Sequence, residues 1–224
     1  MKIYGGYFKT IKGILKLFKP AKHVPEQSSL EPPTVFVGHH QNMRGPVYSA
    51  LWYPGEAHIW VLGVFFTYKD CYRQFVDFTF TTRTGMPVFL AKIIAAPVAA
   101  VYSALMRSAG AIPVHRGTAK IRETISLSLD ALKHGENIIV FPDIDYSSSN
   151  DDMGDIYTGF LQLERFYYKS EGKHLNFAPI AVDLASKSLR VGKKIAFKDG
   201  EAFIDGKTRI ANELRDGINN LGKR

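Results

Sequence analysis

The sequence has little of what extracellular and metal-binding proteins use to stabilise their folds. It contains one cysteine, Cys71, so no internal disulfide can form. Its seven histidines have no cysteine partners at zinc-ligand spacing, which excludes a zinc ribbon or finger. With 46% hydrophobic and 22% charged residues, the composition also excludes extensive disorder. The 224 residues therefore predict one domain of generous size, or a domain with a short arm, in a reducing compartment.

Acidic residues are absent from the first 25 positions, which hold six lysines. The whole chain has 29 basic and 21 acidic residues, a formal net charge of +8, so the remaining chain carries only +2. A basic arm on a nearly neutral body argues against a broad nucleic-acid face, although the high isoelectric point keeps a nucleic-acid-binding domain as an alternative. We expect no nucleic-acid partner.

The same arm has the pattern of a helix that lies on a membrane surface. Residues at steps of three and four predict one apolar side: Tyr4, Tyr7, Phe8, Ile11, Ile14, Leu15 and Phe18. Lysines fill the rest of the circumference, an arrangement that favours anionic headgroups. We expect residues 1–33 to form a basic amphipathic membrane-binding arm with a proline-rich linker, attached peripherally at the cytoplasmic face of the cell membrane. A terminal helix packed on its own domain is the alternative.

No long uncharged apolar run is present. The most apolar stretch, residues 86–106, is interrupted by Lys92 and Pro97, and its uncharged part covers 14 residues, 93–106. A spanning helix requires about 20. We expect a buried or partly inserted helix here, and no transmembrane segment.

Over residues 34–224, short runs rich in β-branched residues alternate with helical patterns. Strands are predicted at 34–37, 59–65, 111–114, 137–141, 176–182 and 193–197. Helices are predicted at 46–52, 70–81, 88–108, 118–133, 157–169 and 208–221, with Thr118 as an N-cap. This alternation predicts an α/β domain with a mixed β-sheet flanked by helices, in which ligands bind at strand ends.

Histidine, arginine and aspartate side chains follow three of the predicted strands. They are His39 and His40 after the first, His115 and Arg116 after the third, and Asp143 and Asp145 after the fourth. Together they supply a candidate base, an anion clamp and an acidic partner. Singly, each also has a structural explanation, such as a helix cap for the histidine pair. The Asp143-x-Asp145 spacing is similar to that of a calcium loop, but Ser148 and Gly154 occupy its diagnostic positions, so no metal site is expected.

Four sequence blocks, in order, resemble the glycerolipid (lysophospholipid) acyltransferase superfamily, the family of 1-acylglycerol-3-phosphate acyltransferases. The blocks are His40-Gln41 with Pro46, Gly110 with Arg116, Phe141-Pro142-Asp143, and Ala178-Pro179-Ile180. The resemblance covers residues 34–205. It implies a glycerol-3-phosphate acyltransferase-like fold that needs no cofactor beyond its acyl co-substrate.

The resemblance also implies a chemistry. A peripheral-membrane acyltransferase would transfer a fatty acyl group from acyl-CoA or acyl-carrier protein to the hydroxyl of a lysophospholipid such as lysophosphatidic acid. His40 would be the general base, and Arg116 would bind the phosphate of the acceptor. Asp143 would contact the acceptor, and Arg44 and His115 are further substrate-binding candidates.

The chain departs from the family pattern at the residue that orients the histidine. Gly45 stands where the family has an aspartate, and Asp145 is the expected stand-in. Loss of the orienting carboxylate costs a serine protease about 10⁴ in rate. The alternative is therefore a weak or inactive acyltransferase-fold protein that binds lipid at the membrane.

Overall fold

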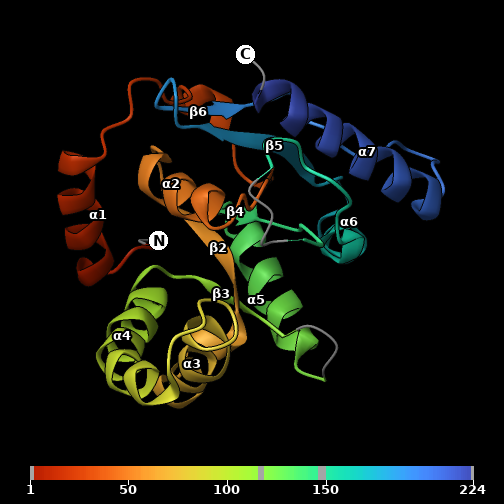
Figure 1. Ribbon diagram of the computed structural model, residues 1–224. Helices are drawn as coiled ribbons and strands as arrows, with labels where there is room; N and C mark the ends of the chain where they lie inside the picture. The colour runs from red at the N-terminus through yellow and green to blue at the C-terminus, as the bar shows by residue number, and fades with distance from the viewer. Residues whose placement is uncertain (1–2, 116–118, 146–149, 223–224) are drawn as a thin grey trace.

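The computed structural model describes residues 3–115, 119–145 and 150–222 (Figure 1). Over these residues the chain forms one six-stranded sheet in the order β3-β2-β4-β1-β5-β6. The strands are β1 (Thr34–Gly38), β2 (Ala57–Leu62), β3 (Ile112–Val114), β4 (Asn137–Val140), β5 (Asn176–Asp183) and β6 (Ser188–Val191). All pairs are parallel except β5 with β6. The prediction of an α/β fold with a mixed sheet is confirmed.

The described part of the chain forms seven α-helices. They are α1 (Gly6–Phe18), α2 (Arg44–Trp52), α3 (Tyr68–Gln74), α4 (Val88–Ser108), α5 (Ile121–Lys133), α6 (Gln162–Glu171) and α7 (Phe203–Gly222). Shorter turns of 3₁₀ helix form η1 (Gln27–Leu30), η2 (Gly63–Phe65) and η4 (Thr158–Leu161), and a π-helical segment forms η3 (Phe75–Phe80).

The buried side chains of β1 alternate between the two faces of the sheet, as the strand period requires. Val35 and Val37 join the core formed with α5, α6 and α7, whereas Phe36 joins the core formed with α2. Both faces are therefore covered, which explains why β1 is an unbroken apolar run. The register pairs Val37 with Val140, so the carboxyl ends of β1 and β4 lie together, whereas β5 continues three residues beyond Ile180, the partner of Gly38.

Two predicted elements are wrong in position. The sixth strand is Ser188–Val191, whereas residues 193–197 contribute one bridge, from Ile195 to Phe177. A turn with positive φ at Lys187 folds β6 back onto β5. Residues 188–191 therefore occupy the free edge of β5 from Ile180 to Asp183 before the chain reaches residue 193. The strand predicted at 59–65 ends at Leu62, and Gly63 begins η2. The predicted N-cap, Thr118, lies outside the described residues.

The helix predicted at residues 88–108 is confirmed as α4, with the same bounds. It continues through Lys92 and Pro97 for 21 residues, and among the described residues it is the one helix long and apolar enough to cross a membrane. Only 22% of its most apolar window is buried. Its buried stripe consists of small side chains spaced four residues apart: Ala91, Ala95, Ala99 and Ser103.

The first turns of α1 pack on the body of the protein (Figure 1). Tyr4 and Phe8 are buried against Ala109, and the Phe8 backbone N–H donates to Ser108 Oγ at 3.0 Å. Lys9 forms an ion pair with Glu56 at 2.8 Å. The packed-helix alternative therefore describes the first half of α1. The second half, from Gly13 to Phe18, is exposed.

Candidate functional site

One aspartate joins the two histidines at the end of β1. His39 Nδ1 forms a hydrogen bond with Asp143 Oδ1, and the His40 backbone N–H donates to Asp143 Oδ2 at 2.9 Å. His39 Nε2 lies 2.9 Å from the backbone oxygen of Asn150. We call His39, His40, Asp143 and Asn150 the histidine–aspartate site. It is built because β1 and β4 are adjacent parallel strands that end side by side.

The loop that follows β1 has an unusual backbone. Gln41, Asn42 and Met43 have φ values of 44°, 48° and 77°, a region that non-glycine residues seldom adopt. Asn42 receives a hydrogen bond from the Arg83 guanidinium, which comes from the connection between η3 and α4. The loop also closes on itself, because the Met43 N–H donates to His40 Nδ1 at 3.2 Å. These contacts hold both histidines against β4.

Gly45 makes this loop possible. Its N–H donates to the His40 carbonyl oxygen at 3.1 Å. A Cβ built on Gly45 would lie 3.3 Å from that oxygen and 3.0 Å from the His39 carbonyl carbon, with the His39 carbonyl oxygen closer still. An aspartate at position 45 does not fit this turn. Asp143 instead supplies the carboxylate next to the histidine pair.

The electrostatics of the site favour a charged imidazole. His39 is 7% exposed and Asp143 3% exposed. Burial opposes the charged ring, but the hydrogen bond and the charge of Asp143 outweigh it and raise the pKa of His39 above its ordinary value of 6.5. Because Nδ1 faces a carboxylate and Nε2 faces a carbonyl, the doubly protonated ring satisfies both acceptors. A neutral, basic His39 requires that Nε2 give up the Asn150 carbonyl.

A cavity of about 310 Å³ opens beside His39. Its lining is rich in carboxylates and consists of His39, Asp143, Ile144, Asp145, Asn150, Asp152, Gly154 and Asp155. A cavity of this size suits a small polar ligand or the end of a larger one. The carboxylates favour groups that donate hydrogen bonds or carry positive charge.

The structure brings three of the six predicted site residues into one region. Asp143 and Asp145 line the same cavity, and His40 lies next to it in the histidine–aspartate site. The His40 ring faces the Phe141 ring edge-on, with centroids 6.3 Å apart. Its Nδ1 accepts the Met43 N–H, so the neutral ring carries its proton on Nε2.

Of the other three predicted residues, two lie away from this region and one is outside the residues that the structure describes. Arg44 begins α2 and is exposed. His115 follows β3, which is separated from β1 by β2 and β4, a distance of about 14 Å across the sheet. The His115 ring packs on Gly63, where a Cβ would lie 2.5 Å from its Nδ1. Arg116 lies outside the described residues.

Sequence reasoning misses His39 and Asn150 as members of the site, and it misses the contact of Arg83 with the loop after β1. The sequence favours a capping role for His39, yet this residue provides the ring that Asp143 binds. The adjacent pair His39-His40 indicates that one of the two rings faces β4, because neighbouring side chains on an extended chain point to opposite sides. The sequence does not show which ring this is. Arg83 is 41 residues from Asn42, and no local pattern indicates their contact.

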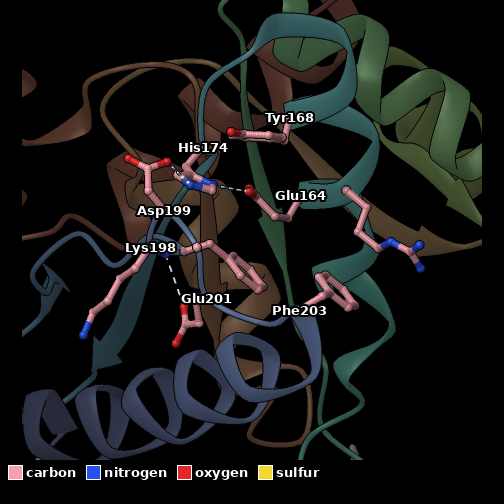
Figure 2. A pocket seen from close by; sticks show the side chains of 10 residues that line it. Glu164, Tyr168, His174, Lys198, Asp199, Glu201 and Phe203 are labelled. Atoms are coloured by element: carbon pink, nitrogen blue, oxygen red, sulfur yellow. Dashed lines mark hydrogen bonds and ion pairs between the residues drawn. The ribbon is translucent and has the colours of Figure 1, made fainter.

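A second cavity, of about 210 Å³, lies between α6 and the segment before α7 (Figure 2). His174 Nδ1 lies 2.5 Å from Glu164 Oε1, and His174 Nε2 lies 3.2 Å from Asp199 Oδ1. The ring stacks on Tyr168. Burial opposes its charge, but the two carboxylates outweigh burial and raise the pKa of His174 above 6.5. The His174 side chain ties α6 to the chain before α7, which is a structural role.

The described residues that line the two cavities do not form the ligand set of a metal centre. Among the residues that the structure describes, no group of three or more His, Cys, Asp or Glu side chains is placed to hold a metal ion. Comparison of the chain with protein-family models, with curated proteins and with solved structures finds no match. The class that the fold and the site define is therefore an α/β protein with a buried histidine–aspartate pair at the carboxyl edge of its parallel strands.

Proposed function

We propose that the protein is a peripheral-membrane O-acyltransferase that moves a fatty acyl group from a CoA or carrier-protein thioester to a lysophospholipid hydroxyl. The observation that carries the proposal is the contact between Asp143 and the His39 ring. It supplies the orienting carboxylate that Gly45 removes from the motif, at the end of the strand where the resemblance places the base. The lysine-rich α1 attaches the protein to anionic lipid at the cytoplasmic face.

In the proposed step the acceptor oxygen attacks the carbonyl carbon of the thioester as its proton passes to His39 Nε2. The carbon–sulfur bond breaks, and the departing thiolate takes the proton back from His39. Asp143 holds Nδ1–H and stabilises the imidazolium that forms in between. The acceptor hydroxyl takes the place of the Asn150 carbonyl, 2.9 Å from Nε2. His39 thus takes the role of base that the resemblance gives to His40, and Asp143 takes the orienting role for which Asp145 is the expected stand-in.

The acidic lining of the cavity bears on the acceptor. Four aspartates line the cavity beside His39, so a phosphate monoester is repelled unless a guanidinium such as Arg116 reaches it. A lysophospholipid whose head group carries an amine is attracted by the same carboxylates. We therefore expect lysophosphatidylethanolamine to be a better acceptor than lysophosphatidic acid.

The test is release of free thiol from an acyl thioester in the presence of each lysophospholipid. His39→Gln is expected to lower turnover by a factor of about 10² to 10⁴, the usual range for a general base. His134→Gln is the matched control, because His134 is an exposed histidine at the end of α5. A loss of turnover in His40→Gln but not in His39→Gln would show that His40 is the general base. Absence of thiol release with every acceptor would overturn the proposal.

A second function, lipid binding without turnover, is favoured by one observation. Both ring nitrogens of His39 already face acceptors, Asp143 and Asn150, an arrangement that the doubly protonated ring satisfies and the neutral ring does not. A protein of this kind would bind lysophospholipid equally well before and after the His39→Gln substitution and would release no thiol. The same assay, with lysophospholipid binding measured in parallel, separates the two functions.

A further inference from the structure

The acidic residues of the chain avoid two long stretches. Residues 1–25 and 78–122 together hold 12 of the 29 basic residues and none of the 21 acidic ones. The rest of the chain holds 17 basic and 21 acidic residues, a net charge of −4. The first stretch includes α1 and the second includes α4. Phe8 of α1 packs on Leu105 and Ala109 at the end of α4.

The same two helices carry a large share of the exposed apolar side chains. On α4, Phe89 is 70% exposed and Ile93 is 67% exposed, and Val88 and Val101 are exposed as well. On the second half of α1 the exposed apolar residues are Ile14, Leu15, Leu17 and Phe18. Soluble proteins seldom expose an apolar surface of this extent unless a partner or a membrane covers it.

The packing of α4 determines how it meets that partner. Its small-residue stripe lies against Cys71, Phe75 and Val76 of the α3–η3 segment. Its last turn holds α1 through Ser108. Because contacts run along its whole length, α4 cannot cross a bilayer without losing them. It can lie in the plane of a membrane surface with its opposite face inserted.

We infer that α4 is the principal inserted element of a lipid-binding surface that it forms together with the second half of α1, and that the partner is an anionic phospholipid bilayer. The charge of the two stretches selects the partner, because each stretch combines apolar with basic residues and neither contains an acidic residue. The inference rests on the membrane partner of the proposed function and assigns the surface that meets it. The inference also sets how the histidine–aspartate site lies relative to the membrane, because Arg83, just before α4, holds the loop of that site.

The test uses the full-length protein and co-sedimentation with vesicles of phosphatidylcholine, with and without phosphatidylglycerol. Phe89→Ser with Ile93→Ser is expected to weaken binding to the anionic vesicles by about 100-fold, because each buried apolar side chain contributes substantially to insertion. The matched control is Ile204→Ser on α7, since Ile204 is 75% exposed but lies outside the two stretches. Binding of this control should equal that of the unmodified protein.

Three results would overturn the inference. One is equal binding by the α4 double variant and the Ile204 control. Another is binding that does not depend on phosphatidylglycerol or on salt. The third is a dimer in the absence of lipid that the α4 double variant dissociates, which would make the face a contact between two copies. Each outcome is independent of turnover, because thiol release with a short-chain, water-soluble acyl thioester and acceptor measures the proposed function without vesicles.

Discussion

Replacing Gly45 tests the geometry of the histidine–aspartate site most directly. A Cβ at this position would meet the backbone of His39 and His40, with the His39 carbonyl carbon at 3.0 Å and its oxygen nearer. Backbone atoms cannot swing aside as a side chain does, so the loop must shift. Overpacking typically costs 1–3 kcal/mol, and we expect Gly45→Ala to lie at the upper end, about 3 kcal/mol of unfolding free energy.

The measurement is chemical denaturation of the unmodified protein and the variant. Their midpoints are compared with the same dependence of unfolding free energy on denaturant concentration. Gly13→Ala is the control, because Gly13 sits inside α1 and nothing lies within 4 Å of the position that its new methyl group would take. There alanine is expected to stabilise the protein by up to about 1 kcal/mol. Gly45→Asp recreates the family motif, yet we expect it to lower turnover as well as stability. A stable Gly45→Asp variant with increased turnover would refute the tight turn and restore the pairing of His40 with residue 45.

Three further predictions concern charge and packing. Turnover that needs neutral His39 should rise with pH, with a midpoint above pH 6.5, because the pKa of His39 is raised. Asp143→Asn removes the carboxylate that raises this pKa, so it should move the midpoint of the pH–rate profile to lower pH. The stabilisation from His174 is fully present below pH 6.5 and is lost as the pH rises through the raised pKa of the folded state, so denaturation should show His174→Gln to be more damaging at about pH 6 than at about pH 9. Leu214→Ala removes a fully buried side chain from the core under α7 and should cost about 2–5 kcal/mol in the same measurement.

The central strands could be predicted from the sequence because burial on both faces leaves an unmistakable pattern. The run Thr34–Gly38 is fully buried, and β4 is likewise. The edge of the sheet is harder to predict, because residues 188–191 and 193–197 are both short runs that mix apolar with basic residues. Which run pairs with β5 depends on where the chain turns, and the turn is made at Lys187, a residue type with no preference for positive φ.

The site could be predicted only to the level of its strands. The sequence places two histidines after β1 and two aspartates after β4, and adjacent strand ends bring them together. The pairing of His39 with Asp143 follows from the dihedral angles of Gln41, Asn42 and Met43, and of these only asparagine favours the left-handed region. The side chain orientations therefore depend on tertiary contacts that no local pattern specifies.

The separation of charge along the chain has a consequence before any lipid is touched. Helices α1 and α4 lie on one side of the molecule and α6 and α7 on the other (Figure 1). With positive charge concentrated in the first pair of segments and a net negative charge in the remainder, the protein is an electric dipole. In the field of an anionic surface such a molecule rotates while it is still about one Debye length, roughly 8–10 Å, away. At an anionic bilayer, the partner proposed above, this rotation would bring α1 and α4 to the surface first and so raise the share of collisions that lead to binding.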